Sequence, residues 1–71
     1  MDESQRDAKE VMDENDAAAF LHLSVSFLRS RRASGEEPRF VRLGRLVRYR
    51  REDLIAWLSA NVVGPESGVE P

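Results

Sequence analysis

With 71 residues the chain has room for one small core, and with no cysteine it can form neither a disulfide nor a thiolate metal site. Its formal net charge of -2 conceals a segregation of charge, because nine of its eleven basic residues are arginines between Arg29 and Arg51. Acidic residues gather at both ends, so the sequence predicts one compact cationic patch that binds a polyanion. No apolar run approaches the roughly 20 residues of a membrane span, and Asp2 and Glu3 are unlike a secretory signal. We expect a cytoplasmic protein.

The residues that could carry catalysis or bind metal are few. His22 is the sole histidine, which excludes a histidine-rich metal site. No nucleophile can be combined with a base and an orienting group from this composition. The acidic pair Glu52 and Asp53 is adjacent in sequence, and adjacent side chains on a helix point apart. We therefore expect no catalytic residue, no metal ligand and no cofactor.

Composition divides the chain into a folded unit and two tails. Residues 1–11 are polar and acidic without helical periodicity, and residues 63–71 are rich in Gly, Pro, Glu and Ser. Both segments are typical of disordered tails. The folded domain is expected at residues 12–62.

Two short helices with clear start signals come first. Asp13 is a good N-cap and Asp16 stands three residues later, which predicts a helix over residues 14–21. Ser24 is a second N-cap, so the next helix should begin at Val25. Two short helices joined by a tight turn are the outline of a helix-turn-helix.

The second helix carries the predicted base-reading side chains. Phe27 and Leu28 are expected to be buried against the first helix, which leaves the other face for a major groove about 12 Å wide. A solvated polar face is the alternative, and the exclusive use of arginine as the charged residue favours the groove. The predicted DNA contacts of this helix and its N-cap are Ser24, Val25, Ser26, Arg29, Ser30 and Arg32.

A loop over residues 33–38 ends the second helix and leads to the arginine-rich segment RFVRLGRLVRYR. If residues 44–46 form a three-residue hairpin loop, Leu43 pairs with Val47 and Val41 pairs with Tyr49. All four apolar side chains then share one face of the hairpin. This arrangement is the one we expect.

A two-residue turn at Gly44 and Arg45 gives a different register. It places Arg42 beside Val47, and it mixes charge into the apolar face. The tip of the three-residue loop projects Arg45 next to a glycine that lets the backbone approach DNA closely, as in a wing. The predicted DNA contacts of the wing are Arg42, Gly44, Arg45 and Arg48.

The last predicted element is a helix within REDLIAWL. Glu52 and Asp53 suit its first turn through the helix dipole, and Leu54, Trp57 and Leu58 form its expected buried stripe. The predicted fold is mostly α with a two-stranded β-hairpin wing, a winged helix-turn-helix.

This order of elements resembles a family of small DNA-binding proteins: the phage-type excisionases, the small prophage regulators and the DNA-binding heads of MerR-like proteins. The resemblance covers residues 13–58, in the segments AAAFLHLSVSFL at 17–28, PRFVRLGRLVRY at 38–49 and REDLIAWL at 51–58. It implies that the second helix reads the major groove and that the hairpin tip contacts the minor groove or the backbone. The chain departs from the family at His22, where Gly is frequent, at Arg31, where a large apolar residue is frequent, and at Leu46, where Arg is usual.

The resemblance implies a sequence-specific protein that binds double-stranded DNA and directs excision with a site-specific integrase. It also implies head-to-tail self-association on DNA, for which Leu46 offers an apolar contact. Transcriptional regulation of prophage or mobile-element genes is a second hypothesis, because the same module performs it. A third hypothesis, from another class, is a protein-interaction module whose arginine face docks an acidic partner.

Overall fold

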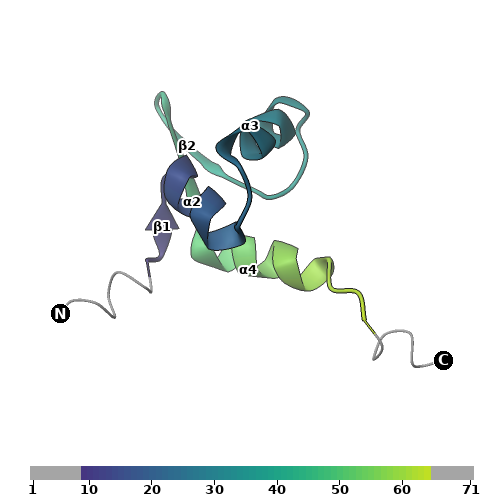
Figure 1. Cartoon of the computed structure of the whole chain (residues 1–71). Helices are drawn as coiled ribbons and strands as arrows, with labels where there is room; N and C mark the ends of the chain where they lie inside the picture. The colour runs from purple at the N-terminus through teal and green to yellow at the C-terminus, as the bar shows by residue number, and fades with distance from the viewer. Residues whose placement is uncertain (1–8, 65–71) are drawn as a thin grey trace.

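The computed structural model describes residues 9–64 and shows, within them, three short helices packed around a small antiparallel sheet (Figure 1). The strand order is β1-β3-β2. No helix among these residues has the length and apolar character needed to cross a bilayer. The elements are β1 (Val11–Met12), α2 (Glu14–Leu21), α3 (Val25–Ala33), β2 (Val41–Leu43), β3 (Leu46–Arg50) and α4 (Arg51–Ala60).

Helix α2 has the predicted bounds. The carboxylate of Asp13 accepts a hydrogen bond from the backbone N–H of Asp16 at 2.8 Å, as an N-cap does. The helix ends at His22, whose φ of 59° lies in the left-handed region. Glycine adopts that region with the least strain, so the backbone of His22 is strained at this turn.

Helix α3 also begins where the sequence predicts. The hydroxyl of Ser24 accepts a hydrogen bond from the N–H of Phe27 at 3.0 Å. At the other end, the N–H groups of Gly35 and Glu36 donate to carbonyls of the last helical turn at 3.1 and 2.9 Å. With Gly35 at a φ of 71°, this pattern is a Schellman motif. Helix α3 therefore ends at the loop over residues 33–38, as the sequence predicts.

The register of the hairpin differs from the expected one. Val41 pairs with Arg48 and Leu43 pairs with Leu46, so the connection is a two-residue turn and the three-residue loop is wrong. Leu46, expected in the loop, is the first residue of β3. The register that forms is the one that mixes charge into the apolar face.

Turn geometry explains this register. Gly44 has a φ of 64° and Arg45 has no positive φ, a pattern that fits a type II′ turn, whose twist matches the flanking strands. Leu43 and Leu46 are 55% and 53% exposed, so the tip of the hairpin projects beyond the core. Burial of one face therefore does not select the register there, and Arg42 stacks its guanidinium 5.4 Å from the Phe40 ring on the inner face.

A third strand, β1, extends the predicted two-stranded hairpin. Val11 pairs with Arg50 and Met12 pairs with Tyr49. Val11 was assigned to the N-terminal tail, and that assignment is wrong for this residue. The remainder of the two predicted tails lies mostly outside the described residues.

The core sits where α2, α3, α4 and the inner face of the sheet meet. Helix α2 contributes the small buried side chains of Ala17 and Ala18 to this core. Tyr49, Leu28 and Leu54 are fully buried, which fixes β3, α3 and α4 to one another. The buried apolar residues are Met12, Ala17, Ala18, Leu21, Leu28, Tyr49 and Leu54.

Arg31 contacts two aromatic rings, and the sequence analysis did not predict these contacts. Its guanidinium carbon lies 5.5 Å from the ring centres of both Phe27 and Trp57, within the range of cation–π attraction. It also donates a hydrogen bond to the Glu37 carbonyl and pairs with Glu36 at 3.4 Å. This arginine therefore links α3 and α4.

Two residues expected to be buried are more open than predicted. Phe27 is 38% exposed, because Arg31 rather than another apolar side chain covers its ring. Leu58 is 43% exposed, at the end of α4 that extends past the core.

Candidate nucleic-acid interface

Helix α3 and the tip of the hairpin lie on the same side of the molecule, and α4 lies on the opposite side (Figure 1). Between α3, the start of α2 and the hairpin runs an open groove of about 350 Å³, which we call the interface groove. Its walls combine the acidic start of α2 with arginines of α3 and of the wing. The lining residues are Asp13, Glu14, Asn15, Arg29, Arg32, Arg45, Leu46, Val47 and Arg48.

Most predicted contact residues of α3 are accessible. Ser24, Ser26 and Ser30 are exposed, and the side chain of Arg29 is 62% exposed. Val25 is half-buried, and it packs against the core rather than projecting freely. The accessible residues of α3 therefore present small polar groups and one long cationic side chain.

Arg32 does not project outward, and that part of the prediction is wrong. Its side chain is 17% exposed, and its Nη1 donates a hydrogen bond to the hydroxyl of Tyr49 at 3.0 Å. The same nitrogen lies 3.3 Å from Oε1 of Glu14. Residues four apart share a helix face, so Arg32 follows the buried Leu28. Its hydrogen bond to Tyr49, which raises the pKa of Arg32, fastens α3 to β3.

Glu14 is a site residue that the sequence analysis missed. Nε and Nη2 of Arg29 donate to its Oε1 and Oε2 at 3.2 and 2.6 Å. These hydrogen bonds are the main reason that the pKa of Glu14 is lowered from its ordinary 4.5, and they raise the pKa of Arg29. An acid in the first turn of a helix is ordinary, so nothing in the sequence distinguishes Glu14 from its acidic neighbours.

The wing carries charge that no carboxylate within residues 9–64 compensates. Arg42 and Arg45 are exposed and Arg48 is half-buried, and none of the three forms an ion pair with another described residue. Arg48 donates from Nη1 to the carbonyl of Val47 at 2.8 Å, which holds part of its side chain along the strand. At Gly44 an added Cβ would meet no atom within 4 Å, so only its positive φ requires glycine.

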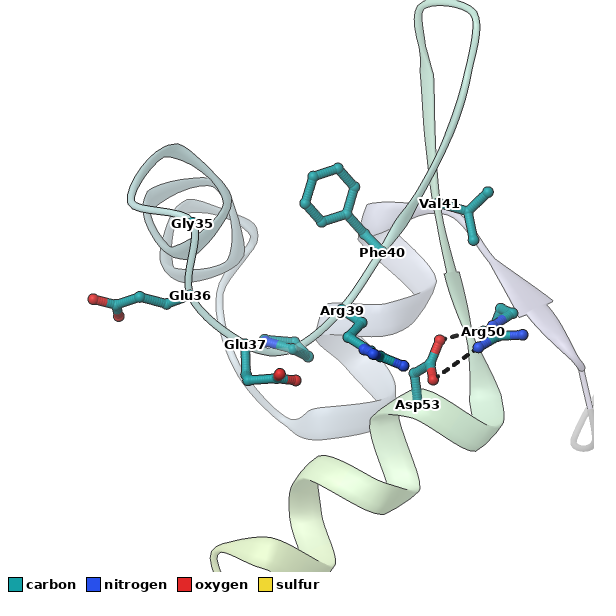
Figure 2. Close-up of a pocket in the computed structure, with 9 residues that line it drawn as sticks. Gly35, Glu36, Glu37, Arg39, Phe40, Val41, Arg50 and Asp53 are labelled. Carbon is teal, nitrogen blue, oxygen red and sulfur yellow. Dashed lines mark hydrogen bonds and ion pairs between the residues drawn. The ribbon is translucent and has the colours of Figure 1, made fainter.

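Arg50, near the end of the cationic segment, is paired with carboxylates. Figure 2 shows a second groove, of about 370 Å³, where Arg50 donates to Asp53 at 2.7 and 3.1 Å. These hydrogen bonds lower the pKa of Asp53 and raise that of Arg50. Arg50 also pairs with Glu52 at 3.0 Å. Among the described residues, the charge of Arg50 is therefore paired with carboxylates, whereas the charges of the three wing arginines are not.

A helix-turn-helix that presents Arg29 from its second helix, beside a hairpin with three uncompensated arginines, defines a winged helix-turn-helix DNA-binding protein. The family model described as "Helix-turn-helix domain" matches residues 11–62, and the chain belongs to this family. The match begins at the first residue of β1. Among curated proteins, none matches the chain at a significant level.

Proposed function

We propose that the chain is a sequence-specific DNA-binding protein of the excisionase type, which bends DNA and promotes integrase-mediated excision without catalysing a step itself. The observation that carries the proposal is the placement of Arg29 and the wing arginines on two sides of one groove. Helix α3 has the size that enters a major groove. The uncompensated wing then meets the adjacent phosphates or minor groove.

Arg29 and Arg45 have different roles in this proposal. Arg29 projects from the reading helix and contacts a base, whereas Arg45 lies in the turn and contacts the backbone. Arg29→Ala should cost about 1 to 3 kcal/mol on the preferred site and little on random DNA. Arg45→Ala should weaken binding to both. Equal losses on both DNAs for both variants, measured by titration, would refute this division.

The excision role draws on the resemblance of residues 13–58 to excisionases, and regulation of mobile-element genes remains the second candidate. Footprinting on the genomic DNA that surrounds the gene locates the binding sites. An excision assay with the integrase encoded nearest to the gene then separates the roles. Excision that depends on this protein and is lost with Arg29→Ala supports the proposal. Footprints confined to a promoter, with no effect on excision, favour regulation.

The acidic-partner hypothesis predicts a different ligand preference for the same arginines. A patch that docks an acidic protein should bind an acidic peptide at least as well as duplex DNA of matched charge. Competition between the two ligands at several salt concentrations decides between them. Stronger binding to the peptide would contradict a DNA-binding role for the wing.

Self-association on DNA is part of the proposal. Leu43 and Leu46 form a cross-strand pair, and each is more than half exposed, so the wing offers an apolar contact to a neighbouring copy. Leu46→Glu should reduce the cooperativity of binding to a full site and change single-site affinity by less than about tenfold, or 1.4 kcal/mol. Stepwise complexes in mobility-shift titrations support this assembly. A single one-to-one complex on every site longer than two helical turns would contradict it.

A further inference from the structure

The contact between Arg29 and Glu14 uses one particular edge of the guanidinium group. The carboxylate accepts hydrogen bonds from Nε and Nη2, the side-on edge. A guanidinium is a planar fork with five N–H groups, so the end-on edge formed by Nη1 and the outer hydrogen of Nη2 is not used. Within residues 9–64 Arg29 donates to no other side chain, and it is 62% exposed. The end-on edge is therefore available to a ligand.

Glu14 is itself held firmly. It is the first residue of α2, directly after the N-cap, and its side chain is 21% exposed. Its Oε1 also lies 3.3 Å from Nη1 of Arg32, which is in turn anchored to the Tyr49 hydroxyl. Two arginines of α3 thus hold the carboxylate that orients Arg29, and one of them is anchored to β3 through Tyr49.

Resting on the DNA-binding function proposed above, we propose that Glu14 is a positioning residue for base recognition, which orients Arg29 so that its end-on edge donates to a guanine. Guanine presents two acceptors, O6 and N7, in the major groove, and a guanidinium edge matches both. An arginine that is already oriented loses less conformational freedom on binding than a free one. The same carboxylate repels phosphates, so it disfavours the use of Arg29 as a general backbone contact.

The test compares discrimination between DNAs rather than affinity alone. A preferred site is first selected from a random duplex library with the wild-type protein. Dissociation constants are then measured for that site, for the site with each guanine in turn replaced by 7-deazaguanine, and for an unrelated duplex. Glu14→Gln is compared with Asp16→Asn. The control removes the same charge from the same helical turn, but Asp16 pairs with Lys9 at 2.7 Å and does not contact Arg29.

We expect Glu14→Gln to lower the ratio of preferred to unrelated affinity by about three- to tenfold, or about 0.7 to 1.4 kcal/mol. Asp16→Asn should strengthen binding to both DNAs and leave the ratio within about twofold. One guanine should lose affinity on 7-deaza substitution with the wild type and lose less with Glu14→Gln. In an Arg29→Lys background, Glu14→Gln should no longer change the ratio, because an ammonium has no second edge to orient.

Several results would overturn the proposal. Equal ratios for Glu14→Gln and Asp16→Asn would show that only the charge of Glu14 matters. A gain in affinity for the preferred site at least as large as for unrelated DNA would show that Glu14 competes with DNA for Arg29. Thermal unfolding of each variant verifies that it is folded, and Arg29→Lys, which keeps Glu14, tests the edge requirement separately. A wild-type protein that does not bind duplex DNA would instead contradict the proposed function itself.

Discussion

The salt dependence of DNA binding follows from how many arginines are free to meet phosphates. Arg42, Arg45 and Arg48 have no carboxylate partner among the described residues, whereas Arg29 is paired with Glu14 and is assigned to a base. Arg32 is excluded, because its charge is held between a carboxylate and a hydroxyl. Each neutralised phosphate contributes about -0.9 to the slope of log K against log salt, so three contacts predict a slope of about -2.7.

Fluorescence anisotropy of a labelled duplex, between about 50 and 200 mM salt, measures this slope. Arg45→Ala should reduce its magnitude by about 0.9. Arg39→Ala is the matched control, because Arg39 lies at the α4 end of the hairpin, away from its tip (Figure 2). It should leave the slope nearly unchanged. A slope near zero for the wild type, or equal changes in the two variants, would refute the assignment of the wing as the phosphate-binding element.

Three further predictions concern stability. Tyr49→Phe removes the acceptor of the Arg32 hydrogen bond and should cost about 1 kcal/mol, seen as a fall in Tm of roughly 4 to 8 °C; an unchanged Tm would mean that this bond does not fasten α3 to β3. His22→Gly relieves the left-handed backbone and should stabilise the fold by up to about 1 kcal/mol in urea unfolding, whereas a loss would contradict strain at this turn. Hydrogen bonds from arginine are the chief reason that the pKa values of Glu14 and Asp53 are lowered in the folded state. The two ionised carboxylates therefore contribute fully to stability above their ordinary pKa values of 4.5 and 3.8. This contribution is lost as the pH falls through the lower folded pKa values. Circular dichroism melts across this range should show a steeper acid-side decline for the wild type than for Glu14→Gln.

The helix ends could be predicted because the interactions that set them are local. Asp13 and Ser24 each cap a backbone N–H three residues later, and Gly35 supplies the positive φ that ends α3. Each of these signals lies within one turn of the residue that it affects. A single sequence is enough to identify such signals.

The differences between the predicted and the observed structure arise from non-local contacts or from the choice between competing local rules. Glu14 meets Arg29 only through the packing of α2 on α3, and no sequence spacing indicates this contact. The two residues of β1 are too few to show a strand pattern. Arg32 stands four residues after Leu28, a spacing that indicates the buried face of the helix. The prediction that it faces outward rests on its charge instead. In the hairpin, turn chemistry prevailed over apolar alternation.

The pairing of β1 with β3 has a consequence for biosynthesis. Met12 pairs with Tyr49, and the N–H of Arg51 donates to the carbonyl of Glu10 at 2.8 Å, so the sheet joins residues from both ends of the folded unit. The helix-turn-helix leaves the ribosome before the strand that supplies Tyr49, and long-range pairings form late because they close long loops. A nascent chain therefore completes its core only after β3 and the start of α4 have emerged. A truncated translation product that ends within the hairpin would carry the DNA-reading helix without the scaffold that holds it in place.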